Sequence, residues 1–291
     1  MQELAYERPT TVAEAVALLA RDNACALAGG TDLIPQLREE RKAATRVVDL
    51  KHVPELNRIT RLPDGGWRIG AAVSVACLGA DAGFAAEHAG LLASARMIGS
   101  LQIQSRATLA GNLCNAAPSA DAVPLLIALG AIVEIESADG VRSRAGTGSI
   151  AKGHGKTTLV RGDLVTALLL PPLAPRTAAC YLRFTPRREM DIAVAGSGVV
   201  LTLSGDGAIE TASIVLASVG PVPLRASQAE TLLLRQRPSA ALFTAACAAA
   251  AAECRPISDT RGSAAYRREL VAVLTRRALE DCTRRLGVHL A

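Results

Sequence analysis

The sequence is poor in aromatic residues, with three phenylalanines, three tyrosines and one tryptophan among 291 residues. It therefore offers no aromatic platform on which nucleic-acid bases could stack. Basic residues outnumber acidic ones by 32 to 27, but they are spread from Arg8 to Arg285 and form no dense run. This distribution does not favour a nucleic-acid partner. Half of the residues are apolar, so small aliphatic side chains must build a sizeable core.

Pairs of metal-binding residues are also lacking. The seven cysteines are scattered without a CxxC pair, and the four histidines are not at ligand spacing. This spacing argues against a disulfide framework and excludes an iron–sulfur cluster held by this chain alone. HExxH and Gly-x-Ser-x-Gly are absent too, so the sequence predicts no metal site and no catalytic residue of a self-contained hydrolase.

Long hydrophobic runs are missing. The most apolar stretch, residues 240–252, is mostly alanine and is shorter than the ~20 residues that a membrane helix needs. The first residues lack the apolar segment of a secretory signal. Together with an odd number of scattered cysteines, these absences predict a soluble, cytoplasmic protein with no membrane span.

The apolar pattern predicts an α+β chain in two domains. Three prolines between Pro171 and Pro175 can hardly continue a helix or a central strand, so we divide the chain into domains 1–175 and 176–291. In the second domain strand-like runs precede helical ones, which predicts a three-stranded sheet plus helices. The expected strands are 24–28, 47–50, 67–73, 131–136, 164–170, 179–184, 192–203 and 209–219. The expected helices follow Thr11 and Thr31 and lie at 76–81, 91–99, 119–129, 226–234, 239–253 and 263–286.

One segment rich in small residues is Leu27-Ala-Gly-Gly-Thr-Asp-Leu-Ile34. A strand is expected to end at Gly29 and Gly30, and a helix to begin after Thr31 and Asp32, which could cap it. Free backbone N–H groups without a blocking Cβ are suited to holding phosphate. A glycine turn that only folds the helix back explains the segment equally well.

A second segment, Arg106 to Asp121, combines small residues with side-chain acceptors between apolar runs. A buried loop of this kind needs hydrogen-bonding partners, and a ligand can supply them. A purely structural role is equally open for this segment alone. Taken together, the two segments predict a dinucleotide site, because a dinucleotide has two phosphates to hold.

Two other glycine-rich stretches are weak candidates. Gly153–Thr157 is similar to the end of a P-loop, but Ile150 stands where that motif needs glycine. Gly146–Ala151 fits G-x-G-x-x-A, but we expect no strand at Arg142–Arg144 before it. Neither stretch is predicted to bind a nucleotide.

The order of the two small-residue segments resembles a known family. Ala28-Gly-Gly-Thr-Asp32, then Ala107-Thr-Leu-Ala-Gly-Asn112 and Pro118-Ser-Ala-Asp121, resemble the FAD-binding medium subunit of molybdenum hydroxylases of the xanthine dehydrogenase and aerobic carbon monoxide dehydrogenase type. The resemblance runs over nearly the whole chain. It implies a two-lobed FAD-binding domain of the p-cresol methylhydroxylase type, followed by a small α+β C-terminal domain.

The resemblance also implies which residues bind FAD. In the family the two small-residue loops hold the pyrophosphate, the aspartate matching Asp121 bonds the cofactor, and the positions matching Val165 and Arg183 lie against it. The residues carried over are Leu27, Ala28, Gly29, Gly30, Thr31, Asp32, Leu33, Thr108, Leu109, Ala110, Gly111, Asn112, Asp121, Val165 and Arg183.

The chain departs from the family pattern at a few positions. Ala110 stands where the second loop usually has glycine, Arg183 where lysine is common, and Gln104 where arginine is common. The family's Phe-Phe-x-Gly stretch is missing near Ser149, so the resemblance assigns no role to residues 145–156.

The resemblance implies an oxidoreductase subunit without its own substrate chemistry. Such enzymes oxidise substrate at molybdopterin in a large subunit and pass electrons through [2Fe-2S] clusters of a small subunit to FAD, which delivers them to an acceptor. The implied assembly is a dimer of heterotrimers. A stand-alone FAD-dependent oxidoreductase, which would need a general base near the flavin, stays open, as does a non-catalytic scaffold protein. The sequence names neither the organic substrate nor the acceptor.

Overall fold

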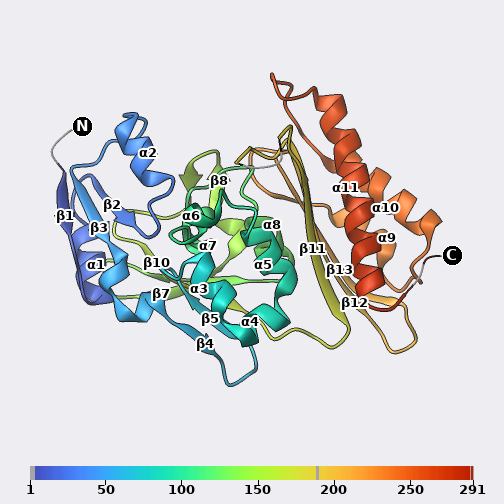
Figure 1. Cartoon of the computed structure of the whole chain (residues 1–291), viewed down its shortest axis with the longest axis horizontal. Helices are drawn as coiled ribbons and strands as arrows, with labels where there is room; N and C mark the ends of the chain where they lie inside the picture. The colour runs from blue at the N-terminus through green and yellow to red at the C-terminus, as the bar shows by residue number, and fades with distance from the viewer. Residues whose placement is uncertain (1–3, 188–189, 289, 291) are drawn as a thin grey trace.

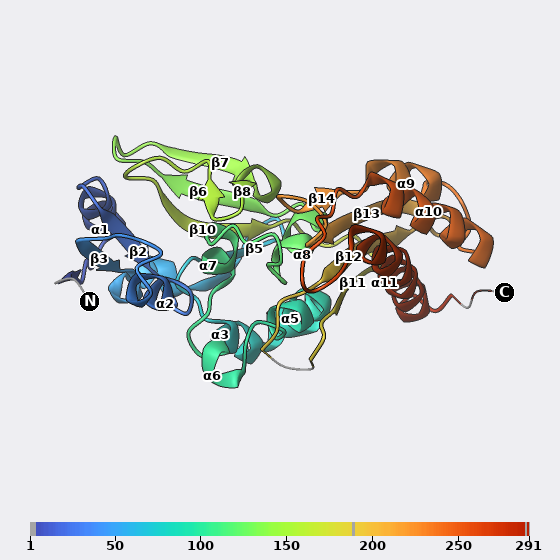
Figure 2. The same cartoon turned by 90° about the horizontal axis from the view of Figure 1, so that it is seen from above.

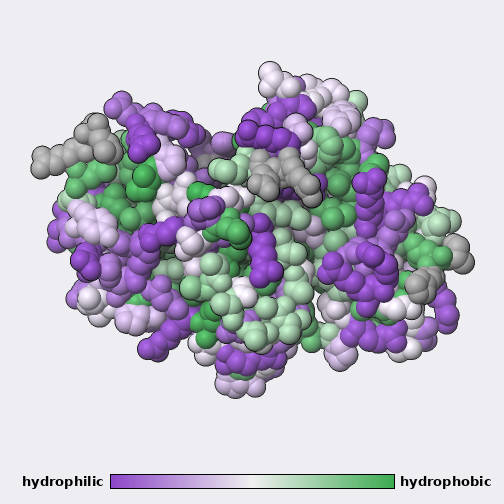
Figure 3. All heavy atoms as spheres, in the orientation of Figure 1, coloured by the Kyte–Doolittle hydropathy of each residue, from purple (hydrophilic) through white to green (hydrophobic). Residues whose placement is uncertain are grey.

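The computed structural model describes residues 4–187, 190–288 and 290. Figure 1 shows three parts in a row: a small N-terminal lobe, a middle lobe, and a C-terminal sheet with helices on its outer face. Figure 2 shows the same order from above. Hydrophilic residues are spread over the face drawn in Figure 3 and do not gather in one patch, which agrees with the absence of one dense basic run in the sequence.

The N-terminal lobe is a three-stranded parallel sheet with strand order β1-β3-β2. The capping box predicted at the first helix is confirmed, because the Thr11 hydroxyl accepts from the Glu14 amide while the Glu14 carboxylate accepts from the Thr11 amide. The buried face of this helix packs in the core of the lobe. The elements are β1 (Ala5–Glu7), α1 (Val12–Leu19), β2 (Ala24–Leu27), α2 (Leu33–Arg38) and β3 (Arg46–Asp49), followed by two short 3-10 turns.

The middle lobe is a five-stranded antiparallel sheet of order β4-β5-β10-β6-β7. Its strands are β4 (Ile59–Arg61), β5 (Trp67–Gly70), β6 (Ile132–Glu136), β7 (Arg142–Gly146) and β10 (Leu164–Leu170). Its helices are α3 (Val75–Ala80), α4 (Ala82–Glu87), α5 (Ala89–Ala95), α6 (Leu101–Gln104), α7 (Leu109–Cys114) and α8 (Val123–Ala128). A small hairpin, β8 (Ala151–Gly153) and β9 (Lys156–Thr157), stands apart from the large sheet.

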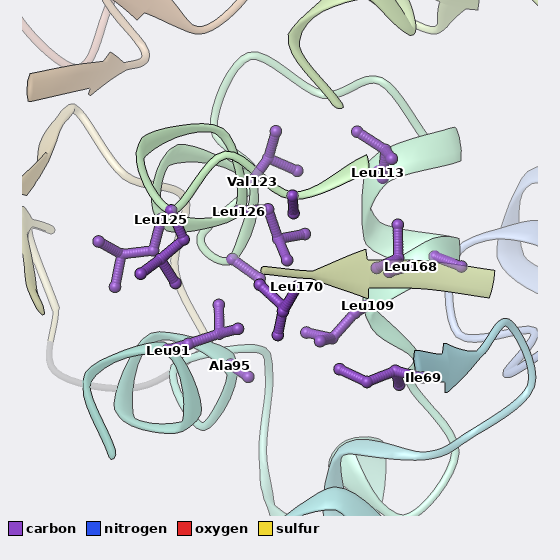
Figure 4. Close-up of a cluster of buried hydrophobic side chains, with 14 of the residues drawn as sticks. Ile69, Leu91, Ala95, Leu109, Leu113, Val123, Leu125, Leu126, Leu168 and Leu170 are labelled. Carbon is purple, nitrogen blue, oxygen red and sulfur yellow. The ribbon is translucent and has the colours of Figure 1, made fainter. Parts of the chain in front are cut away.

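Strand β10 is the centre of the middle lobe and is buried at every position. Figure 4 shows Leu168 and Leu170 of this strand among leucines of α5, α7 and α8. A continuous apolar run is expected of a strand that is covered on both faces, which is why the sequence predicted β10 correctly.

The C-terminal part is an antiparallel sheet whose outer face is covered by three helices. Its elements are β11 (Thr177–Phe184), β12 (Ala195–Leu203), β13 (Ile209–Ala217), β14 (Leu224–Arg225), α9 (Ser227–Leu233), α10 (Ala240–Glu253) and α11 (Ala264–Arg285). The predicted sheet of three strands is wrong by one strand, because β14 pairs with β13. A strand of two residues shows no alternation from which it could be recognised.

Two further predictions are wrong in the middle lobe. Arg142–Gly146 is the edge strand β7, although its mostly exposed polar residues hide the alternation of a strand. Leu109–Cys114 is a helix, where a loop was expected. After β7 the chain enters a 3-10 turn and then β8, so Gly146–Ala151 still lacks the helix that a dinucleotide fingerprint requires.

The C-terminal sheet packs closely against the middle lobe at Gly90 of α5. A Cβ on this glycine would lie 2.2 Å from the carbonyl oxygen of Ala179 in β11. We expect Gly90→Ala to push α5 away from the sheet and to lower the free energy of unfolding by about 1–3 kcal/mol, as overpacking does. Urea unfolding measures this loss. Gly205→Ala is the control, because its Cβ would meet no atom within 4 Å, and equal stability of the two variants would contradict the expectation.

Candidate functional site

A cavity of about 520 Å³ lies between the N-terminal and middle lobes. It is lined by Gly29 to Asp32 of the β2–α2 loop and Leu33 of α2, by Thr108 at the N-cap of α7 and Ala110 to Asn112 within it, and by Val165 of β10. These two segments, predicted from the sequence to act together, therefore do face one cavity. Its size falls in the range of about 300–1,000 Å³ that is typical of small-molecule sites.

Gly29 allows the two segments to touch backbone to backbone. A Cβ on this residue would lie 2.2 Å from the carbonyl oxygen of Arg106 and 2.9 Å from Cα of Ala107. The next residue, Gly30, has φ +80°, a left-handed conformation that glycine adopts at low cost. Both glycines are thus required by the geometry of this wall of the cavity.

The β2–α2 loop offers unused hydrogen-bond donors to the cavity. Within the described part of the chain, none of the amides of Gly29, Gly30, Thr31 and Asp32 donates to a backbone carbonyl. In α7, by contrast, the Gly111 amide is occupied by the Thr108 hydroxyl at 2.8 Å. Consecutive free amides at a concave wall form an anion-binding surface.

The carboxyl of Asp32 on this loop also forms no hydrogen bond or ion pair with another described residue. Asp32 occupies the N-cap position of α2 without forming a side-chain capping bond, so the cap predicted there is wrong. Burial raises the pKa of its carboxyl, and the nearby charge of Arg41 acts in the opposite direction. The carboxyl belongs to the lining of the cavity.

Asp121 and Arg183 are brought together outside the lining of the cavity. Asp121 accepts a hydrogen bond from the Tyr181 hydroxyl at 3.1 Å and pairs with the Arg183 guanidinium. The side chain of Asp121 is 9% exposed and that of Arg183 is 11% exposed. Burial raises the pKa of Asp121 to about 6, against the lowering effect of Arg183 and Tyr181. This pair joins the middle lobe to β11.

Two of the predicted FAD-binding residues, Leu27 and Leu109, are buried, at 7% and 2% exposure, and neither lines the cavity.

Gln104, one of the departures from the family pattern, donates its side-chain amide to the carbonyls of Arg96 and Ile98. Ile98 lines the cavity. Gln104 therefore fixes the backbone of one cavity wall.

Several lining residues had no signal in the sequence. The β8–β9 hairpin, within the segment that had no assigned role, brings His154 and Gly155 to the cavity. The Gly155 amide donates to the carbonyl of Ala116 at 3.0 Å, which holds the hairpin against the chain after α7. Lining residues that sequence reasoning missed also include Gln36, Arg41 and Lys42, whereas Asn115 lies in the predicted segment 106–121 but was not singled out as a binding residue.

The structure also bears on the predicted absences. Among the described residues, no group of three or more His, Cys, Asp or Glu side chains could hold a metal ion. In the same part of the chain, no helix is both long and apolar enough to cross a membrane.

Comparison with known protein families identifies both parts of the chain. Residues 2–173 match the family described as the FAD binding domain in molybdopterin dehydrogenase. Residues 180–282 match the CO dehydrogenase flavoprotein C-terminal domain. The chain belongs to the FAD-binding medium subunits of the molybdenum hydroxylase family. This confirms the predicted family, the FAD cofactor of this chain and its class as an oxidoreductase subunit.

Individual relatives and solved structures agree with this membership. The chain is 35% identical to the carbon monoxide dehydrogenase medium chain of Afipia carboxidovorans, covering 94% of this chain and 95% of the relative. It is 30% identical to the putative xanthine dehydrogenase FAD-binding subunit of Escherichia coli, covering 97% of each. A crystal structure of Cu,Mo-CO dehydrogenase matches with a TM-score of 0.92 at 32% identity, over 97% of this chain and 98% of that one. The predicted α+β fold is confirmed.

Proposed function

We propose that this chain is the flavin-carrying electron-transfer subunit of a molybdenum hydroxylase complex. It would accept electrons from [2Fe-2S] clusters of a small subunit and pass them to an external acceptor. The observation that carries the proposal is the cavity wall of four consecutive amides at Gly29–Asp32, which donate to no backbone carbonyl among the described residues and are suited to an anionic partner. Family membership supports FAD as that partner.

The residues of the cavity fit the parts of FAD. We assign the amides of Gly29 to Asp32 and the Thr108–Asn112 segment to the diphosphate, because both lie on one concave wall and a Cβ at Gly29 would separate them. Val165 offers an apolar surface beside them. Bound FAD supplies the redox chemistry, since it can exchange electrons singly or in pairs, and the protein supplies orientation and electrostatics.

Asp121 and Arg183 are proposed to act at the flavin end. The family resemblance assigns both positions to the cofactor, and in the structure they form a nearly buried pair between the middle lobe and β11, outside the lining of the cavity. Leu27 and Leu109 are proposed to support the two loops from the core, because both are buried and neither lines the cavity.

The partners are proposed from the relatives. The similar solved structures include a Cu,Mo enzyme and a carbon monoxide dehydrogenase of Hydrogenophaga pseudoflava that lacks the Mo-pyranopterin moiety. We therefore propose that a large molybdopterin subunit and a small iron–sulfur subunit assemble with this chain as a dimer of heterotrimers. We place the complex in the cytoplasm, because all seven cysteines are free thiols.

Purification of the native complex through a tag on this chain tests the proposal. We expect iron and molybdenum to co-purify, about one FAD to be bound per copy of this chain, and removal of FAD to block electron delivery to an acceptor dye while the iron–sulfur clusters still become reduced. A chain that binds no FAD would refute the proposal. An isolated chain whose flavin is reduced directly by an organic substrate would instead identify a stand-alone oxidoreductase.

A further inference from the structure

The loop between α2 and β3 brings two cationic side chains to the cavity. Arg41 and Lys42 both line it, together with the free amides of the β2–α2 loop. Neither residue belongs to the glycine loop or to the α7 segment. The only other histidine, lysine or arginine among the described lining residues is His154, so Arg41 and Lys42 are the fixed positive charges of this cavity.

Gln36 determines where these two side chains start. Its carbonyl oxygen accepts from the amides of Arg41 and Lys42, at 2.9 and 3.2 Å. Its side-chain amide donates to Asn115 Oδ1 at 3.0 Å, across 79 positions of sequence. Asn115 directly follows α7. One residue of α2 therefore joins the N-terminal lobe to the end of α7 and holds the backbone of the cationic loop at that junction.

The two cations differ in their surroundings. The Arg41 guanidinium lies 2.5 Å from a carboxylate oxygen of Glu39, so part of its charge is already balanced. Lys42 takes part in no ion pair between described residues. Lys42 also lies near Cys114, another residue of the cavity lining: burial raises the pKa of the Cys114 thiol to about 12, and the charge of Lys42 acts in the opposite direction. Lys42 is thus the uncompensated cation next to α7.

The charges on the cavity wall are otherwise unfavourable for an anion. Asp32 and Asp163 also line the cavity, whereas the backbone amides contribute only partial positive charge. A dinucleotide diphosphate brings two negative charges. A full cation near the diphosphate offsets this repulsion, and hydrogen bonds to ionised groups are stronger than neutral ones.

We propose that Lys42, assisted by Arg41 and positioned by Gln36, pairs with the diphosphate of FAD and supplies the charge-dependent part of its affinity. This inference rests on the proposed function, since it takes FAD to be the ligand of the cavity. Lys42 and Arg41 are then binding residues, whereas Gln36 acts through them.

The test is a titration of the FAD-free full chain with three ligands: FAD, ADP and riboflavin. We expect Lys42→Gln to raise the Kd for FAD and for ADP about tenfold and to leave the Kd for riboflavin, which has no phosphate, unchanged. The FAD affinity of the wild-type chain should fall with ionic strength more steeply than that of Lys42→Gln, because salt screens an exposed charge pair. Lys42→Arg should retain both the affinity and the salt dependence.

Two further variants test the positioning role of Gln36 and the effect of removing a nearby charge outside the cavity. Gln36→Leu should flatten the salt dependence although both cations remain in the chain. Arg38→Gln is the matched control, because Arg38 lies at the end of α2, is exposed, and does not line the cavity. Unchanged Kd values and an unchanged salt dependence in Lys42→Gln would overturn the inference, and so would an equal loss of riboflavin binding. If the wild-type chain itself binds no FAD, the proposed function fails together with the inference.

Discussion

Gly29→Ala should strongly weaken FAD binding by the full chain. The new Cβ would lie 2.2 Å from the carbonyl oxygen of Arg106, where backbone cannot yield without separating the two cavity segments. Overpacking of this kind costs about 1–3 kcal/mol. Where this free energy destabilises the FAD-bound conformation and not the FAD-free one, the Kd for FAD rises by up to about a hundredfold. Flavin absorbance per folded chain and an FAD titration measure the effect.

The control for this substitution is Gly146→Ala, in the same domain. A Cβ at Gly146 would meet no atom within 4 Å, and the backbone there has φ −64°. This variant should bind FAD like the wild-type chain. Full FAD content in Gly29→Ala would show that the diphosphate does not bind between these two segments.

The second large effect is expected when the ion pair between Asp121 and Arg183 is broken. Arg183→Met would leave a carboxylate that is 9% exposed without its cation, which typically costs about 3–5 kcal/mol. The loss should depend on pH. The pKa of Asp121 in the folded chain is about 6, above the unfolded value of about 3.9, so its ionisation already reduces stability as the pH rises through about 4 to 6.

Without Arg183 the folded-state pKa of Asp121 should rise further. At pH 5 the carboxyl of the variant can remain protonated, so we expect a smaller loss of unfolding free energy than at pH 8. The double variant Asp121→Asn, Arg183→Met should recover most of the loss, since no buried charge remains. Urea unfolding of the wild type, both single variants and the double variant at the two pH values measures this double-mutant cycle. An equal loss at both pH values, or no recovery in the double variant, would contradict this account.

Long or strongly patterned elements could be predicted from the sequence. Strand β10 was recognisable because it is apolar throughout, and α11 because Leu274, Ala278 and Cys282 recur every four residues on its buried side. Helices of four to six residues contain too few turns to show a clear helical period. The short helices α4, α6 and α7 were missed, whereas α3 and α8, also six residues long, were predicted with shifted bounds.

The candidate site was predictable only where local chemistry is unusual. Gly29 and Gly30 are recognisable because glycine pairs permit close contact and left-handed backbone. Lys42 and Gln36 carry no local signal, because their position at the cavity results from a contact with Asn115 in another lobe. Likewise, the pairing of Asp121 with Arg183 spans 62 positions and could not be deduced from spacing.

The packing of the C-terminal sheet has a consequence for how the chain folds. Tyr181, Val200 and Ala217 of this sheet belong to the same hydrophobic cluster as Leu125 and Leu168 of the middle lobe, although the two family matches divide the chain between residues 173 and 180. The inner face of the sheet would be left in water if the second part folded alone. The two parts should therefore unfold in one cooperative transition, and an exchange of C-terminal domains between relatives would succeed only if α5 and α8 are exchanged with the sheet.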